Sequence, residues 1–148
     1  MMPQGPGRML GSRTVPDPIP LELSEKRRLL YGKGLDRERS SVVNALVAKG
    51  RLAESLEYLE RSKDFGALGQ VRRDAVAAGD LFSLVRSCQI LKADADPAEL
   101  RELAGNAERA ERWYDAVNAL ARAGDEEKSE ALRLARCPEF QLFKPANK

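Results

Sequence analysis

Catalytic chemistry in this chain would have to rely on carboxylates and thiols, because its 148 residues include no histidine. Without an imidazole, Ser-His and Cys-His nucleophilic pairs and histidine-ligated zinc are excluded. The two cysteines, Cys88 and Cys137, are too few for a four-cysteine zinc or iron–sulfur site. The sequence therefore predicts no catalytic residue, no cofactor and no metal site.

The remaining reactive groups lie in patterns that favour structural roles. Cys88 falls on an apolar helical stripe and is expected to be buried, whereas Cys137 precedes Pro138 at a helix end that is open to exposure. No base is positioned to activate either thiol, and the carboxylates follow the spacing of solvated helix faces. Metalloprotease, nucleophile-elbow, P-loop and dinucleotide-binding motifs are absent from the sequence. An enzyme that uses Asp or Glu as acid and base is the least favoured class.

The amino-acid composition predicts an all-α protein. Hydrophobic residues make up 43% and aromatic residues 5%, and the helix-favouring Ala and Leu dominate the apolar set. No apolar run approaches the ~18–20 residues that a membrane span needs, and no apolar signal segment follows Met1. The two cysteines make a poor disulfide framework. We therefore expect a cytoplasmic protein without membrane contact.

Proline positions divide the chain into three parts. Residues 1–23 form a Pro- and Gly-rich leader, in which prolines at alternate positions from Pro16 exclude a helix and favour an extended segment. This leader is interpreted either as disordered in isolation, the favoured alternative, or as an arm that binds a partner. Residues 24–137 carry the helical periodicity, and residues 138–148 form a tail.

Apolar residues at spacings of three and four predict eight helices, the first of them short. Their expected ranges are 24–31, 36–49, 52–63, 65–78, 81–91, 97–107, 110–123 and 126–137. The strongest start signal combines Asp96 as N-cap, Pro97 at the first helical position and Glu99 two residues later. Further N-cap candidates are Ser24, Asp36, Asp80 and Asp125. Because the connections are short, consecutive helices are expected to lie antiparallel.

An internal repeat groups these helices into pairs. In each copy an apolar helix, a small residue, a turn and a second apolar helix follow one another, over 42–59, 71–88 and, less closely, 103–120. Gly50 and Gly79 occupy the same turn position, and Glu111 takes the glycine position in the third copy. Repetition at this period is typical of stacked helical hairpins.

The repeat resembles the tetratricopeptide-like α-solenoids over roughly residues 36–136. The residues that follow the family's spacing in the third copy are Leu103, Ala104, Ala107, Trp113, Ala116, Leu120 and Ala123. A looser match comprises Val42, Leu46, Gly50, Leu52, Ser55, Leu59 and Ser62. The turn also resembles that of irregular solenoids attached to β-propellers in coat and trafficking proteins. The resemblance implies a stack of about three antiparallel hairpins with a groove that binds a partner protein.

Aromatic residues outside the apolar stripes are candidates for binding a partner. Trp113 lies on the apolar face of its helix and is expected in the core, which places Tyr114 nearer the edge. Tyr58 similarly stands beside an apolar stripe. For both tyrosines the alternative, equally favoured, is a half-buried position between helices. In the tail, Phe140, Leu142 and Phe143 are expected to cover the last helix, or else to form a linear docking motif.

The only concentration of basic residues comprises Lys26, Arg27, Arg28, Lys33, Arg37 and Arg39. Acidic residues interrupt it and only Tyr31 accompanies it, so a solvated helix face is favoured over a phosphate-binding surface. The sequence as a whole favours a non-catalytic protein–protein interaction or assembly module. The alternative is a small nucleic-acid-associated protein that uses residues 26–39. The oligomeric state is left open.

Overall fold

The computed structural model describes residues 17–140, and this part of the chain contains eight α-helices and no strand. The helices are α2 (Leu23–Tyr31), α3 (Asp36–Ala48), α4 (Leu52–Ser62), α5 (Phe65–Ala78), α6 (Leu81–Leu91), α7 (Pro97–Arg109), α8 (Trp113–Arg122) and α9 (Glu126–Arg136). The all-α prediction is confirmed. The leader up to residue 16 and the tail beyond residue 140 lie outside the described residues.

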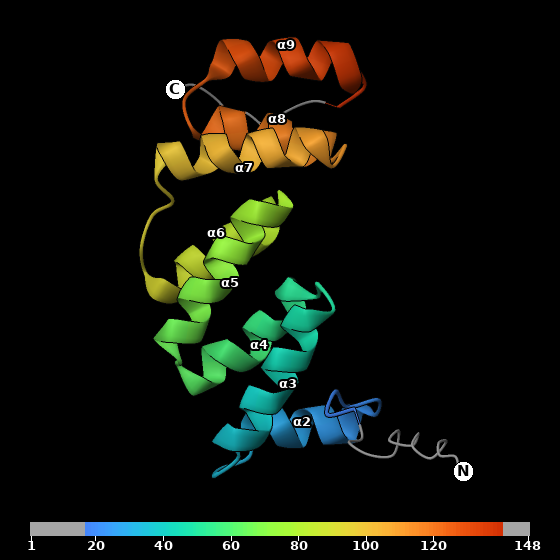
Figure 1. Ribbon diagram of the computed structural model, residues 1–148, viewed down its shortest axis with the longest axis vertical. Coiled ribbons are helices and arrows are strands. Elements are labelled where there is room, and N and C mark those ends of the chain that lie inside the picture. The colour runs from blue at the N-terminus through green and yellow to red at the C-terminus, as the bar shows by residue number, and fades with distance from the viewer. Residues whose placement is uncertain (1–16, 141–148) are drawn as a thin grey trace, which may run out of the picture.

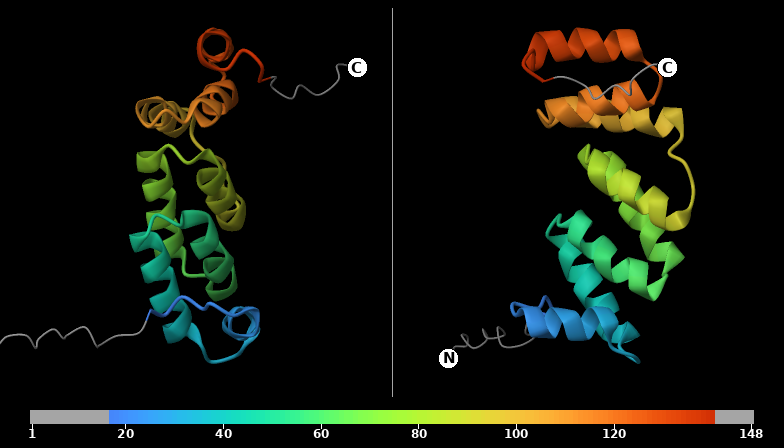
Figure 2. Two further views of the ribbon diagram at one scale, coloured as in Figure 1. Left: turned by 90° about the vertical axis from the view of Figure 1, so that its right-hand side faces the viewer. Right: turned by 180° about the vertical axis from the view of Figure 1, so that it is seen from behind.

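The helices form an elongated molecule in which α2 and α9 lie at opposite ends (Figure 1). Seen along the helix pairs, α3, α5 and α7 lie on one side, and α2, α4, α6 and α8 lie on the other (Figure 2). Each of α3–α4, α5–α6 and α7–α8 packs closely, and contacts between α4 and α6, α5 and α7, and α6 and α8 join successive pairs. The last helix, α9, packs on α8.

Left-handed residues end the helices and explain why the turn recurs. Gly50 has φ 73°, Gly79 has φ 71° and Glu111, the residue aligned with these glycines, has φ 59°. In each case the next amide donates to a carbonyl five residues back, as in Arg112 N to Ala107 O at 2.8 Å. This arrangement satisfies carbonyl groups at the helix end and reverses the chain within two residues. Lys63, Lys92 and Gly124 also have positive φ at the other turns between α4 and α9.

Helix start signals were predicted with mixed success. Asp96 accepts from Ala98 N, and its capping box with Glu99 is present, with Pro97 at the first position. Asp80 also caps its helix, by accepting from Ser83 N at 3.1 Å. Of the other candidates, Ser24 and Asp36 lie inside α2 and α3, whereas Asp125 occupies the N-cap position of α9 without a side-chain hydrogen bond to the helix.

The close approach of α5 and α7 centres on Gly79. A Cβ at this position would lie 2.5 Å from Ala107 Cα and 2.6 Å from its nitrogen, so the backbone of α7 occupies the space of a side chain. Beside this contact, Asn106 Nδ2 donates to Val76 O at 2.7 Å. These contacts set the position of α7 against α5.

An ion pair joins the same two helices near the long α6–α7 connection. Arg72 on α5 donates to both carboxylate oxygens of Glu99 on α7, at 2.7 and 2.8 Å, and also to Asp94 O at 3.3 Å. The hydrogen bonds from Arg72 hold the pKa of Glu99 below its ordinary value, against the opposing effect of partial burial. The side chains of Arg72 and Glu99 are 21% and 20% exposed, so the pair is shielded better than a surface pair.

Two boundaries and one helix face differ from the prediction. The helix predicted over 110–123 begins at Trp113 instead of Ala110, because α7 continues to Arg109 and the left-handed turn follows it. On α9, Leu134 is 59% exposed, and Ala131 and Ala135 are exposed as well. The face that packs on α8 instead contains Ser129, whose hydroxyl donates to Val117 O at 2.8 Å.

The Gly79 contact predicts a large loss of stability on adding one methyl group. We expect Gly79→Ala to lower the free energy of unfolding by about 3 kcal/mol, since it combines left-handed strain with overpacking against α7. Gly50→Ala is the matched control, because Gly50 has the same φ and open space around it. It should cost about 1 kcal/mol. If urea unfolding shows that both substitutions lower the free energy of unfolding equally, the close α5–α7 contact adds nothing to the cost at Gly79.

The Arg72–Glu99 pair predicts a pH-dependent contribution to stability. Because the pKa of Glu99 is lowered in the folded state, the contribution is present above the ordinary value of 4.5 and is lost as the pH falls below it. We expect Glu99→Gln to cost about 1–2 kcal/mol at pH 7 and to cost progressively less in acid. The control is Glu102→Gln on the same helix. A cost of Glu99→Gln that is independent of pH would contradict this assignment.

Candidate partner-binding surfaces

Tyr114 and Phe140, two of the residues proposed from sequence, lie together at the α8–α9 end. Their ring centroids are 4.7 Å apart and the ring planes are 73° apart, which is an edge-to-face contact. Tyr114 is 49% exposed although it carries this contact. Phe140 therefore contacts α8 through Tyr114. Leu142 and Phe143, which with Phe140 were expected to cover the last helix, lie outside the described residues, so that expectation stays a prediction.

Arg133 on α9 holds the beginning of the tail through its main chain. Its Nη1 donates to the carbonyl oxygens of Pro138 and Phe140, at 3.0 and 2.8 Å. The rest of its guanidinium group donates to both carboxylate oxygens of Glu130 at 2.8 Å. A turn closes between Phe140 N and Cys137 O at 3.0 Å. Because carbonyl oxygens are common to every residue, this part of the contact does not depend on the side chains of the bound segment.

A side-chain hydrogen bond supplements the contact. Tyr114 Oη donates to Glu139 Oε1 at 3.0 Å. This bond and the negative charge of Glu139 raise the pKa of Tyr114 above its ordinary value. The phenol therefore stays protonated at neutral pH and remains a donor. The aromatic ring and hydroxyl of Tyr114, together with the guanidinium group of Arg133, can thus hold a short peptide segment.

Cys137, which directly precedes these residues, is buried, and this corrects the expectation of an exposed thiol. Cys137 is 2% exposed and Cys88 is 5% exposed, and both thiols are free. Burial raises the pKa of each, which keeps them protonated and poorly nucleophilic. Burial of Cys88 on the apolar stripe agrees with the prediction.

Two other aromatic predictions need correction. Trp113 is half-buried and not part of the enclosed core. The guanidinium carbon of Arg136 on α9 lies over its ring, 4.8 Å from the ring centroid. Tyr58 is 3% exposed and belongs to the core, so its ring offers no surface to a partner in this conformation. Burial raises the pKa of Tyr58. Its helix packs against α2, α3, α5 and α6, and these neighbours cover the side that the sequence left open.

The predicted basic residues lie at the other end of the molecule: three are on α2, and of the rest Lys33 and Arg37 are exposed in the following turn and at the start of α3. Lys26 pairs with Glu57 at 3.2 Å and Arg28 pairs with Glu25 at 2.7 Å, whereas Arg27 is exposed and forms no ion pair within the described residues. Most of the cationic charge of α2 is therefore neutralised by neighbouring carboxylates.

Arg39 does not belong to a basic surface, because it is 7% exposed. Its Nε donates to Leu29 O at 2.6 Å, and its Nη2 donates to Gly32 O. Its Nη1 forms an ion pair with Asp36 at 3.0 Å. Arg39 therefore joins the end of α2 to the start of α3 and has no donor directed at a phosphate.

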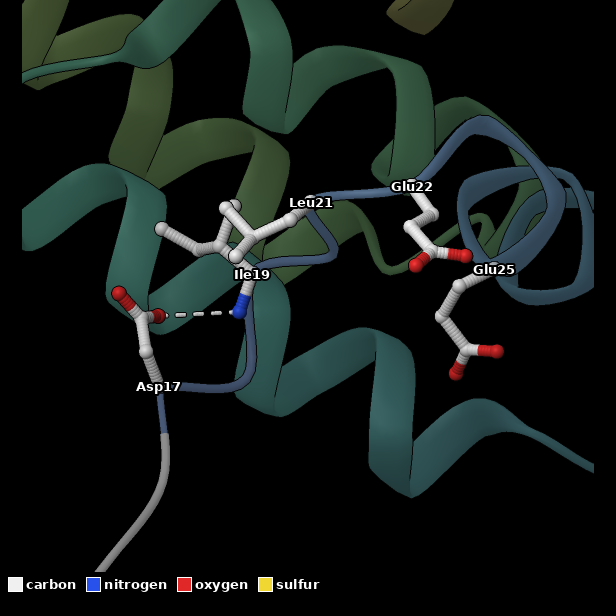
Figure 3. A pocket seen from close by; sticks show the side chains of 5 residues that line it. All are labelled: Asp17, Ile19, Leu21, Glu22 and Glu25. Carbon is white, nitrogen blue, oxygen red and sulfur yellow. Dashed lines mark hydrogen bonds between the residues drawn. The ribbon is translucent and has the colours of Figure 1, made fainter.

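A shallow hollow lies beside α2 (Figure 3). Its lining combines apolar and acidic side chains: Asp17, Ile19, Leu21, Glu22 and Glu25. Asp17 accepts from Ile19 N at 3.0 Å and pairs with Lys49 at 3.1 Å, and these two partners lower the pKa of Asp17. Asp17 and Glu22 precede α2 and Glu25 lies in its first turn, and the side chain of Asp17 lies apart from those of the two glutamates (Figure 3).

Elsewhere the described residues show no concentration of reactive groups. Among residues 17–140, no three acidic or cysteine side chains are grouped so as to hold a metal ion. None of the described helices is long and apolar enough to cross a membrane. No family model matches the chain, and neither a curated protein nor a solved structure shows significant similarity to it.

Several surface residues were missed by sequence reasoning. The contribution of Arg133 had no local signal, because its partners are main-chain carbonyls beyond a helix end and a proline. Leu134 was assigned to the core from its position on an apolar stripe, although the polar Ser129 marks the buried face. Other large apolar side chains found at the surface are Leu21, Leu23, Tyr31, Phe65 and Phe82.

The tail contact predicts that Arg133 controls the reactivity of Cys137. We expect Arg133→Ala to increase the rate of alkylation of Cys137 several-fold. The loss of the hydrogen bonds to Pro138 O and Phe140 O frees the residues that directly follow the thiol. Peptide mapping by mass spectrometry separates Cys137 from Cys88, whose rate should not change. Arg73→Ala, on α5, is the control. Unchanged labelling of Cys137 would show that Arg133 does not hold the tail.

Proposed function

We propose that this protein is a non-catalytic protein-interaction module, built as a short α-solenoid of the tetratricopeptide-like type, that binds a short segment of a partner protein at its α8–α9 end. The observation that carries the proposal is the docking of residues 138–140, in which Arg133 donates to two main-chain carbonyls while Tyr114 contacts Phe140. A surface that holds a turn of its own chain has the groups needed to hold a short segment from another protein.

The arrangement of helices supports the solenoid interpretation. Three helix pairs, α3–α4, α5–α6 and α7–α8, succeed one another, and each contacts the next. A residue with positive φ follows the first helix of each pair at the same position of the repeat: Gly50, Gly79 and Glu111. In such stacks each pair buries one face against its neighbour, and binding surfaces lie on the faces and ends that remain. Two buried free thiols are consistent with the reducing cytoplasm.

The contact at Tyr114 also indicates the chemistry of the partner segment. An aromatic side chain fits against the Tyr114 ring in an edge-to-face contact, and an acceptor at the position of Glu139 accepts a hydrogen bond from the Tyr114 hydroxyl. Arg133 adds donors that any main chain can satisfy. We therefore favour a partner segment with an acidic residue followed by an aromatic one, which replaces or extends the tail.

The nucleic-acid alternative loses support from the placement of the cations. Lys26 and Arg28 pair with carboxylates, and Arg39 is buried with its donors satisfied inside the protein. Phosphate binding relies on cations that release counterions, and paired or buried ones contribute little to it.

The proposal predicts that Tyr114 determines which proteins the full chain retains. Wild-type chain and Tyr114→Ala are used to isolate proteins from the cells of origin, and quantitative mass spectrometry compares the two. We expect at least one protein to be depleted about tenfold with Tyr114→Ala, in line with the cost of losing a central aromatic contact. A synthetic peptide from that protein should then compete.

Glu102→Ala on the exposed side of α7 is the control and should retain the same proteins as wild type. If Tyr114→Ala and wild type retain identical sets in equal amounts, the α8–α9 surface is not the binding site. A salt-sensitive mobility shift with nucleic acid, lost with Arg27→Glu, would favour the alternative function instead.

A further inference from the structure

The two ends of the molecule each present an outer helix face that carries apolar side chains. At one end, Leu23 and Tyr31 on α2 are 62% and 63% exposed, and Arg27 lies between them. The spacing of four residues places the three along one side of the helix. Leu29 and Leu30 of the same helix are buried against the rest of the molecule.

The outer face of α9 is similar in layout but carries the opposite charge. Glu127, Ala131 and Leu134 are exposed, Leu134 by 59%, and their spacing of three to four residues places them along one side. Ser129 marks the opposite, buried side, which faces α8. This outer face is separate from the tail contact, which lies between α9 and α8.

The charges on the two faces have no ion-pair partner among the described residues. Neighbouring Arg28 and Arg133 have carboxylate partners on their own helices, at 2.7 and 2.8 Å. By contrast, neither Arg27 nor Glu127 forms an ion pair with any of residues 17–140. The outer face of α2 thus presents Arg27 between Leu23 and Tyr31. The outer face of α9 presents Glu127 followed by Ala131 and Leu134.

We propose that a second copy of this chain occupies each of these faces, so that the outer face of α2 in one molecule packs against the outer face of α9 in the next. The argument is complementarity of charge and apolar character between two faces of the same chain. Because α2 and α9 lie at opposite ends of the long axis (Figure 1), the contact is heterologous and continues the helical stack from one molecule to the next.

The size of the faces sets the strength of the contact. Two helices of 9 and 11 residues bury less surface than the roughly 1,200–2,000 Å² of a stable complex, so the association is weak and concentration-dependent. An ion pair between Arg27 and Glu127, shielded by Leu23 and Leu134, fixes the relative orientation of the two molecules and makes the association depend on salt. Oligomers of increasing length, without a fixed stoichiometry, are the expected form.

Charge reversal on each face tests the proposal with the full-length chain. Arg27→Glu and Glu127→Arg are studied alone and mixed by sedimentation velocity between about 10 and 500 µM, a range suited to weak contacts. Each variant alone should be monomeric where wild type associates, with its self-dissociation constant raised about tenfold or more. The equimolar mixture should associate again, because it combines one intact α2 face with one intact α9 face, and the two reversed faces also carry opposite charges.

Matched controls are Arg73→Glu on α5 and Glu102→Arg on α7, which make the same charge changes on other surfaces and should associate like wild type. Circular dichroism and melting temperature establish that all variants are folded. A wild-type chain that remains monomeric throughout the range overturns the proposal. So does unchanged association of Arg27→Glu, or a mixture that stays monomeric. None of these results bears on the Tyr114 surface.

Discussion

The contact between Gly79 and the backbone of α7 is the constraint on which the arrangement of the helices depends. A Cβ at residue 79 would lie 2.5 Å from Ala107 Cα, and the φ of 71° at Gly79 also favours glycine. Because the backbones meet here, Asn106 reaches Val76 O and Arg72 reaches Glu99. A single residue without a side chain thus allows α5 and α7 to be joined by a hydrogen bond and an ion pair.

The α8–α9 surface depends on this contact through a series of packed helices. The position of α7 sets that of α8, which packs on it, and α9 is joined to α8 by the hydrogen bond from Ser129 to Val117 O. Tyr114 and Arg133, from these two helices, then hold the segment that ends at Phe140. A partner-binding surface at the end of the stack is therefore supported by the rigid packing within it, although it consists of few residues.

Many charged residues of the described chain are used within the fold, which explains why the protein looks poor in chemistry despite its charge content. Some ion pairs join elements: they link α2 to α4 through Lys26–Glu57, α6 to α4 through Arg86–Glu60, and α7 to the start of α9 through Arg101–Asp125. Others, such as Arg51–Glu54 and Arg133–Glu130, join residues three apart at one helix. These charges contribute to folding and are not grouped for catalysis.

The sequence by itself determined the helices and their turns. Periodic apolar residues, the Asp96 capping box and the glycine position shared by Gly50, Gly79 and Glu111 act over a few residues, so local patterns reveal them. Only the tertiary structure decided which surfaces stay open. Tyr58 is covered by neighbouring helices, Leu134 is left exposed and Arg133 binds carbonyls of the tail. These outcomes depend on what lies across from each residue, and no spacing along the chain carries that information.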